Sequence, residues 1–390
     1  MPSRPLRCLL TVPPLTGHLH PALALAGGWE AAGHEAAWVG NEPVFRPLLG
    51  PGGRLFPTGS RLFREQAGGG EAAVRSLWEG FVVPYSRFTL KAVERAVAEW
   101  RPDVVLVDQH SPAGALAAHR AGVLWATFAP SAMEIGRPLR GERELERWLD
   151  GVLRGLWASA RLPEQEYLDP RFSPGLVLST ASPALLGGEL PPPYATVGPL
   201  LGGRTPAEFP WERLDGSRRR VLVTMGTLSA EVADGFHQRV ARALEELAPD
   251  VQPVLARAGG GPAPAGGIAL DRVPVLELLA RGAVDAVLCH GGMNTVCEAL
   301  VHGVPLVLAP IRHDQPYVAE RVAAAGAGVR VDFAGATSGQ LRDALRTVLD
   351  RPSHRAAALM MGRQLLHGGG VEAAVGHLER FTDGRNRSLR

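Results

Sequence analysis

Short apolar runs alternate with longer amphipathic stretches in both halves of this 390-residue chain. The runs include RCLLTV, DVVLVD, RRVLVT, AVDAVLC and PLVLAP, and the stretches between them are long enough for helices of about ten residues or more. Apolar runs that are buried on both faces of a sheet and alternate with helices are typical of parallel βα units. This pattern predicts the α/β fold class.

A segment without apolar periodicity separates the two halves. VGPLLGGRTPAEFPWERLDGSRRR is rich in proline, glycine and charge, and an apolar run resumes at Val221. A chain of 390 residues also exceeds the length that one hydrophobic core usually organises. We therefore predict one domain over residues 1–200, a linker over 201–218 and a second domain over 219–372.

Composition and charge exclude several classes of protein. Apolar residues make up 46% of the chain and charged residues 21%, as in a folded globular protein rather than a disordered or fibrous one. The net charge is +2 with both signs mixed along the chain, so we expect no nucleic-acid partner. No apolar window reaches transmembrane length, so we expect no transmembrane segment. The three cysteines form no CxxC pair, so we expect a reducing, cytoplasmic location.

The stretch VLCHGGMNTVCEALVHG predicts an anion site. Gly291 and Gly292 follow an apolar strand and precede a helix, where glycines let backbone amides approach a ligand and the helix start offers unpaired N–H groups. Thr295 and Glu298 also have the spacing of a capping box, which would satisfy those N–H groups without any ligand. Capping does not require His290 at the strand end, so the pattern favours a bound phosphate.

Asp314 and Gln315 follow the next apolar run, PLVLAP. Ligands of open α/β sheets bind beyond the carboxyl ends of the strands, so these side chains should lie at the same edge as the anion site. A carboxylate and an amide suit a polyhydroxyl group such as a sugar, although the same pair is common in loops. The chain has no GxxxxGK[ST] and no GxGxxG after its first strand, which disfavours nucleoside-triphosphate hydrolysis and dinucleotide redox chemistry.

A histidine near the end of the first strand is a candidate general base. His18 and His20 lie in TVPPLTGHLHPALALA, and we expect a loop there with the helix beginning at Pro21. The strand VVLVD carries Asp108 to the same edge of the sheet, where a carboxylate could fix the tautomer of His18. Asp108 could instead cap its own loop, and His110 is a rival base.

Aromatic residues are frequent between residues 54 and 87. They could form an apolar wall for a bulky ligand, or they could only cover the N-terminal sheet. The aromatic residues are Phe56, Phe63, Trp78, Phe81 and Tyr85.

Several motifs together resemble the nucleotide-sugar-dependent glycosyltransferases of family 1. They are GHLHP, VDQH, VGPL, MGT and HGGMNTVCEALVHGVPL followed by HDQ. The chain is most similar to bacterial enzymes that glycosylate antibiotics and other natural products, such as macrolide and zeaxanthin glycosyltransferases. The resemblance implies a GT-B fold, in which two Rossmann-like domains have parallel sheets facing a central cleft. It also implies that the segment 373–390 packs back toward the N-terminal domain.

The same resemblance implies a role for each motif residue. His18 would deprotonate the acceptor, and Asp108 would orient His18. The N-terminal domain would bind the acceptor, with the candidate contacts Phe56, Phe63, Trp78, Phe81 and His110. The C-terminal domain would bind the nucleotide-sugar through Thr227, Arg272, Val273, His290, Gly291, Gly292, Asn294, Thr295, Glu298, Asp314 and Gln315. Arg272 and Val273 stand where many relatives have a tryptophan segment that stacks on the nucleobase, so the choice between UDP- and dTDP-sugars stays open.

The implied reaction is an inverting transfer of a hexose or deoxyhexose to a hydroxyl or amine of a small natural product, by an enzyme that is a monomer or a homodimer. We expect no metal and no cofactor beyond the nucleotide-sugar, because oriented amides and a helix start can stabilise the departing diphosphate. Cys289 and His290 are adjacent in a strand and point to opposite faces, which disfavours a zinc site there. Two alternatives stay open: a nucleotide-sugar 2-epimerase, and a non-catalytic sugar-nucleotide-binding protein of the same fold.

Overall fold

The computed structural model describes residues 4–61, 69–136, 143–204, 207–226, 234–257 and 263–388. Two of the predicted site residues, Phe63 and Thr227, lie outside these ranges. The chain forms two compact units. Unit 1 comprises Met1–Arg204 together with His367–Arg390, and unit 2 comprises Thr205–Leu366.

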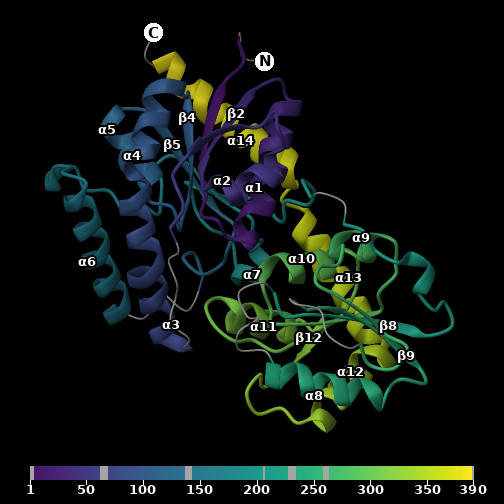
Figure 1. The fold of residues 1–390 in the computed structure, drawn as a ribbon. Coiled ribbons are helices and arrows are strands. Elements are labelled where there is room, and N and C mark those ends of the chain that lie inside the picture. Colours follow the sequence, from purple (N-terminus) through teal and green to yellow (C-terminus); the bar gives the residue numbers. More distant parts are fainter. Residues whose placement is uncertain are drawn as a thin grey trace. The chain divides into compact units, whose positions relative to one another are not determined.

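Unit 1 contains a parallel sheet of seven strands in the order β3-β2-β1-β4-β5-β6-β7. Strands β2, β4 and β5 of this sheet are labelled in Figure 1. The order reverses between β1 and β4, and such a switch point is where open α/β sheets bind ligands. The strands are β1 (Arg7–Thr11), β2 (Glu35–Gly40), β3 (Arg54–Pro57), β4 (Val104–Asp108), β5 (Leu124–Ala129), β6 (Val177–Ser179) and β7 (Tyr194–Thr196).

Helices cover both faces of this sheet. Alternate residues of β1 pack against α1 and α14 on one face and against α4 and α5 on the other. This two-sided burial is the reason that the strands read as continuous apolar runs. The helices are α1 (Thr16–Ala31), α2 (Glu42–Leu49), α3 (Gly70–Ser76), the π-helix η1 (Leu77–Val82), α4 (Val83–Trp100), α5 (Ala113–Ala121), α6 (Arg143–Ser159), η2 (Glu164–Glu166), α7 (Pro183–Leu186) and α14 (Gly370–Ser388).

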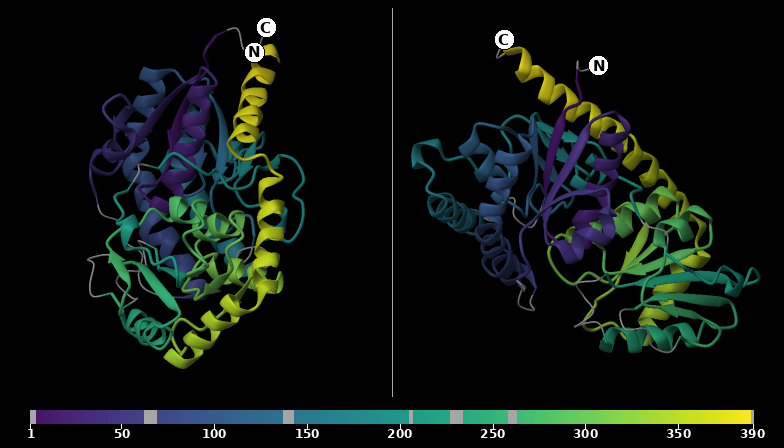
Figure 2. Two further views of the ribbon diagram at one scale, coloured as in Figure 1. Left: turned by 90° about the vertical axis from the view of Figure 1, so that its right-hand side faces the viewer. Right: turned by 45° about the horizontal axis from the view of Figure 1, so that its top comes forward.

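The last helix of the chain, α14, packs on the first, α1 (Figure 2). Gly28 permits this contact, because a Cβ atom there would lie 2.3 Å from Cγ1 of Val371. His34 adds a polar link: its Nδ1 accepts from the backbone N–H of Leu6 at 3.2 Å, and its Nε2 lies 2.9 Å from Glu379 Oε1. The end of the chain is therefore part of the core and polar framework of unit 1.

Unit 2 contains a second parallel sheet, of six strands in the order β10-β9-β8-β11-β12-β13. Its order reverses between β8 and β11. The strands are β8 (Arg219–Thr224), β9 (Val251–Ala256), β10 (Ile268–Leu270), β11 (Ala286–Cys289), β12 (Leu306–Leu308) and β13 (Gly328–Arg330). The helices are η3 (Trp211–Arg213), α8 (Asp234–Glu245), α9 (Val275–Ala280), α10 (Met293–Val301), α11 (Gln315–Ala324), α12 (Ser338–Asp350) and α13 (Pro352–Leu366).

The predicted α/β class is confirmed in both units, since each contains a parallel sheet with helices. The predicted start of the first helix is wrong. α1 begins at Thr16, and Pro21 lies inside it rather than at its start. Among the helices within the described ranges, none combines the length and the apolar character that crossing a bilayer requires.

Candidate active site

The centre of the candidate site in unit 1 is a histidine–carboxylate pair. Asp108 is the last residue of β4, and His18 lies in the first turn of α1, which follows β1. Because β1 and β4 are neighbours at the switch point, both side chains reach the carboxyl edge of the sheet together. His18 Nδ1 lies 2.8 Å from Asp108 Oδ2, and the carboxylate is fully buried.

Asp108 is held at both of its oxygen atoms. Oδ1 accepts from the backbone N–H of His110 at 2.8 Å, while Oδ2 is bonded to His18. Asp108 thus contacts both its own loop and His18, so capping the loop and orienting His18 do not exclude each other. Burial and, to a smaller extent, the charge of Asp108 raise the pKa of the buried Tyr85.

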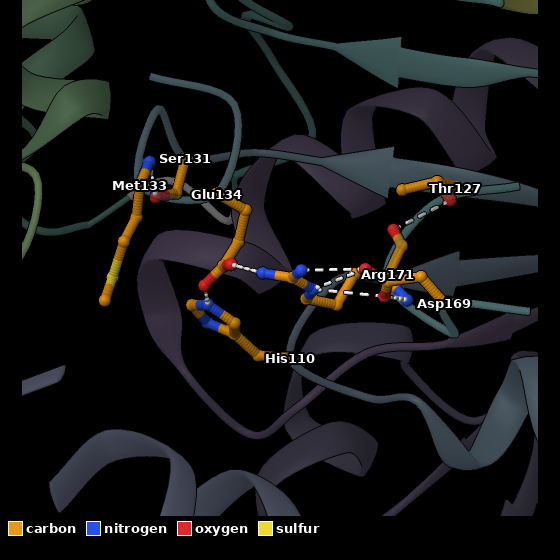
Figure 3. A network of polar contacts seen from close by, with 7 residues as sticks. All are labelled: His110, Thr127, Ser131, Met133, Glu134, Asp169 and Arg171. Carbon is orange, nitrogen blue, oxygen red and sulfur yellow. Dashed lines mark hydrogen bonds and ion pairs between the residues drawn. The ribbon is translucent and has the colours of Figure 1, made fainter. Parts of the chain in front are cut away.

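His110 also belongs to an ionic network with Glu134, Arg171 and Asp169 (Figure 3). Its ring centroid lies 4.9 Å from that of His18, and its Nε2 lies 3.4 Å from Oε1 of Glu134. Arg171 donates to the other oxygen of Glu134 at 2.8 Å and to Asp169 at 2.7 Å. Burial acts to raise the pKa of Glu134, but the hydrogen bond from His110 and the charge of Arg171 outweigh it and lower that pKa.

The same region offers ligands for a metal ion. His18, Asp108 and His110 each have a potential ligand atom, and these atoms lie within 4.8 Å of one another. Within the described ranges they are the one group of three or more such side chains. The carboxylate of Asp108 already accepts two hydrogen bonds, from His18 and from the backbone N–H of His110. The expectation that sugar transfer needs no metal stays a prediction.

Phe56, Trp78 and Phe81 are all buried in unit 1. Phe56 packs between the sheet and α4, whereas Trp78 and Phe81 pack against α6. Trp78 is 0% exposed and meets His110 edge-on, with a ring-centroid distance of 6.0 Å and an interplanar angle of 88°. Contact between these rings and an acceptor stays a prediction, but Trp78 already contributes by packing against the site histidine.

The candidate anion site in unit 2 lies at the switch point of the second sheet. His290 follows β11, and Gly226 follows the neighbouring strand β8. A Cβ atom at Gly226 would lie 2.7 Å from Cε1 of the His290 ring, and one at Gly292 would lie 2.5 Å from its Nε2. Gly226 also has φ of +71°, a conformation that favours glycine. The ring therefore fits only because both neighbouring residues lack side chains.

His290 is neutral at physiological pH. Burial lowers its pKa to about 4, the charge of Arg312 adds to the lowering, and the charge of Asp314 opposes it. Its Nδ1 is buried and has no hydrogen-bond partner in the described part of the chain. A hydrogen bond between the ring and the backbone of Thr224 also opposes the lowering of the pKa, and it engages the one N–H donor of the neutral imidazole.

The start of α10 does not form a capping box. Gly292 is the N-cap, and no side chain bonds to the first turn at that position. Thr295 is the third residue of the helix rather than its cap, so the pattern Thr295-x-x-Glu298 does not satisfy the helix start. Asn294 lies in the same first turn, while Glu298 is buried one turn later.

Asp314 and Gln315 lie at the start of α11, after β12. Gln315 Oε1 accepts from the backbone N–H groups of Ile311 and Arg312 at 3.0 and 3.1 Å, which leaves its amide N–H groups as donors for a ligand. A Cβ atom at Gly291 would lie 3.3 Å from the backbone oxygen of Gln315. The ends of β11 and β12 are thus in close contact, as the sequence predicts.

Arg272 and Val273 lie away from the candidate anion site, at the far edge of the same sheet. They follow β10, the edge strand, which β9 and β8 separate from β11. Arg272 is exposed, and a role in contacting the nucleobase stays a prediction.

Comparison with known proteins identifies the class of the chain. Residues 210–369 match the family described as UDP-glucoronosyl and UDP-glucosyl transferase. The chain is 27% identical to 4'-demethylrebeccamycin synthase of Lentzea aerocolonigenes over 404 residues, which cover 90% of this chain and 94% of the relative. This chain is a glycosyltransferase whose residues 210–369 match that family.

Two further comparisons agree with this conclusion. The glycosyltransferase is 28% identical over 310 residues to the TDP-daunosamine transferase DnrS of Streptomyces peucetius, covering 73% of this chain and 69% of that protein. The structure of the spinosyn rhamnosyltransferase SpnG with thymidine diphosphate matches it with a TM-score of 0.77 at 25% identity, covering 96% of this chain and 100% of SpnG. The predicted GT-B fold, with a Rossmann-like sheet in each unit, is confirmed.

Some residues of the candidate site had no recognisable signal in the sequence. Glu134 and Arg171 lie in an interval without recognisable motifs, 37 positions apart, and only the folded chain pairs them. Gly226 lies in the MGT motif, but its contact with the ring of His290 depends on the pairing of β8 with β11.

Proposed function

We propose that this enzyme is an inverting glycosyltransferase of antibiotic or other secondary-metabolite biosynthesis. It moves a hexose or deoxyhexose from a UDP- or dTDP-sugar to a hydroxyl or amine of a small natural product. The observation that carries the proposal is the 2.8 Å contact between His18 Nδ1 and the buried carboxylate of Asp108. Because the carboxylate accepts from Nδ1–H, Nε2 is the ring atom left to take a proton.

Unit 2 binds the nucleotide-sugar in this proposal. Its support is the packed corner where His290, the glycines that enclose it and the start of α10 lie together. Backbone N–H groups at a helix start attract a diphosphate, and the ring of His290 lies beside that helix start at Gly292. The names of similar proteins are consistent with a nucleotide-sugar donor: one is named a TDP-daunosamine transferase, and SpnG binds thymidine diphosphate.

The transfer is one displacement at the anomeric carbon. His18 Nε2 takes the proton of the acceptor hydroxyl, and the acceptor oxygen forms a bond to that carbon. The bond from the carbon to the diphosphate oxygen breaks, and its electron pair leaves with the diphosphate. Attack from the face opposite the leaving group inverts the configuration. The imidazolium that forms on His18 is stabilised by Asp108.

The acceptor is a bulky, mostly apolar natural product in this proposal. Among similar proteins, one is named for demethylrebeccamycin, and SpnG at 25% identity is known in complex with a spinosyn aglycone. One aromatic residue of unit 1, Trp78, lies near His18, since Trp78 contacts His110 and His110 contacts His18. Aromatic side chains of this kind suit large apolar ligands.

Direct assay tests the proposal. The protein is incubated with UDP- and dTDP-linked hexoses and deoxyhexoses and with a panel of aromatic and macrolide acceptors. Mass spectrometry should detect a hexose or deoxyhexose increment, and NMR should show an anomeric configuration opposite to that of the donor. Retained configuration contradicts the displacement mechanism, and binding of the donor with no product for any acceptor contradicts the transferase function.

A variant of the base gives a sharper test. His18→Ala should lower kcat by about 10²–10⁴-fold, the usual contribution of a general base, while the Kd of UDP or dTDP stays unchanged. His20→Ala, two residues along the same helix, is the matched control and should retain most of the activity. Wild-type turnover by His18→Ala would assign the base role to another group.

A further inference from the structure

Glu134 is a buried carboxylate to which the proposed reaction gives no role. Its side chain is 0% exposed, and it lies after β5 at the same edge of the sheet as Asp108. Burying a carboxylate is costly, and a buried ion pair is often no more stabilising than apolar packing of the same volume. The pair between Glu134 and Arg171 therefore suggests a use beyond stability.

Glu134 stays ionised because it is paired on both sides. Arg171 donates to Oε2 at 2.8 Å, and His110 Nε2 lies 3.4 Å from Oε1. Arg171 is fixed in turn by Asp169, and its backbone oxygen accepts from the Thr127 hydroxyl at 3.0 Å (Figure 3). The carboxylate is thus a fixed acceptor rather than a mobile side chain.

Glu134 also holds the ring of His110, through the hydrogen bond between His110 Nε2 and Glu134 Oε1. The other ring nitrogen, Nδ1, is buried and has no hydrogen-bond partner within the described residues. The same residue donates its backbone N–H to Asp108 Oδ1 at 2.8 Å, and its ring lies 4.9 Å from that of His18. A shift of His110 would therefore move both the carboxylate and the ring of the proposed base.

We propose that Glu134, clamped by Arg171, is a positioning residue for sugar transfer: it holds His110 so that Asp108 and His18 are aligned with the acceptor. This inference rests on the proposed function, in which His18 is the base. A displacement of reacting groups by about 1 Å can lower a rate by about 10²-fold, so the effect of losing Glu134 should appear in kcat.

The test compares graded substitutions of Glu134 with a matched control. Glu134→Gln keeps an oxygen that can accept from His110, whereas Glu134→Leu removes it. We expect kcat to fall by about 10²-fold in Glu134→Leu and by a smaller factor in Glu134→Gln. The Kd of UDP or dTDP should stay at the wild-type value in both. The control is Glu166→Leu, which removes a similar 3.0 Å contact with His119 at the surface and should leave kcat unchanged.

The outcomes separate this inference from the proposed function. Wild-type kcat in Glu134→Leu, beside an active wild type, overturns this inference alone. Equal losses of kcat and nucleotide affinity, or failure of both Glu134 variants to fold by thermal melting, assign Glu134 a structural role and also overturn it. A wild-type chain that binds nucleotide and transfers no sugar overturns the proposed function and this inference together.

Discussion

At the scale of the residue, two glycines determine whether His290 fits at the end of its strand. The imidazole ring occupies the space that a Cβ atom would need at Gly226 or at Gly292. Gly226 also has a positive φ, so two independent physical reasons exclude a larger residue there. Separating these reasons requires a second glycine with positive φ and no close neighbour.

Gly282 provides that control. Its φ is +64°, close to the +71° of Gly226, but a Cβ atom there would meet nothing within 4 Å. Both Gly226→Ala and Gly282→Ala should lose stability by about 1–2 kcal/mol for the left-handed backbone. Only Gly226→Ala should displace the ring, and we expect it to weaken UDP or dTDP binding by at least about tenfold, as measured by calorimetry. Equal nucleotide affinity in the two variants would contradict the role of His290.

The lowered pKa of His290 predicts a pH dependence of stability. In the unfolded chain this histidine has its ordinary pKa near 6.5, whereas the folded value is about 4. Between these values the unfolded state binds more protons, so the free energy of unfolding should fall as the pH drops from about 6.5 to 4. His290→Gln should flatten that part of the curve in urea titrations. An unchanged slope would show that the imidazole titrates normally when folded.

At the scale of the element, the start of α1 places the proposed base. Proline is tolerated in the first turn of a helix, where backbone N–H groups have no intrahelical partner, and this preference predicts a helix that begins at Pro21. The observed helix begins about one turn earlier, at Thr16. His18 therefore lies in a helix, next to the switch point, instead of a loop. Its orientation follows from helix geometry and from the contact with Asp108.

The packing of α1 against α14 can be tested with two adjacent glycines. A Cβ atom at Gly28 would lie 2.3 Å from Cγ1 of Val371, whereas one at Gly27 would meet nothing within 4 Å. Valine is stiff at χ1, so Gly28→Ala should destabilise unit 1 by about 1–3 kcal/mol through overpacking. Gly27→Ala should be neutral or stabilising by up to about 1 kcal/mol, because alanine favours the helix. Chemical denaturation measures both, and equal effects would contradict this packing.

At the scale of the whole molecule, the chain leaves unit 1, forms unit 2 and returns to unit 1 at His367. The side chains of Ala374, Val375 and Leu378 belong to the same hydrophobic core as β1 and α1. The stability of the first unit thus depends on residues that follow the second one in the sequence.

Paired leucine substitutions test this assignment. Leu378 is 0% exposed, and Leu378→Ala should cost about 2–5 kcal/mol through the cavity that it leaves. Hydrogen exchange should then accelerate in β1 and α1, but not in β8 and β11. Leu366→Ala is the control, since Leu366 is 49% exposed at the end of α13 and its truncation should change stability by less than about 0.5 kcal/mol. Acceleration confined to unit 2 in Leu378→Ala would contradict the division of the chain.

Much of the local architecture could be read from the sequence. The buried strands β4 (VVLVD) and β11 (AVLC) are apolar except for the terminal Asp108, and Gly291 and Gly292 after β11 predict a turn into a helix, as observed at α10. The pair His18 and Asp108 could also be anticipated, because parallel strands deliver their carboxyl ends to one edge. The buried state of His34 could not, since nothing in the turn AAGHEAAWV indicates its bonds to Leu6 and Glu379.

The sequence alone determined the fold class, the two sheets and the place of His290 at the end of its strand, because those depend on periodicity and on local turn chemistry. Only the tertiary structure decided which distant side chains meet. Glu134 and Arg171 pair across 37 positions, and Gly226 encloses His290 because β8 and β11 are neighbours. Such contacts depend on strand order and packing in three dimensions, and a single sequence contains no periodic signal for them.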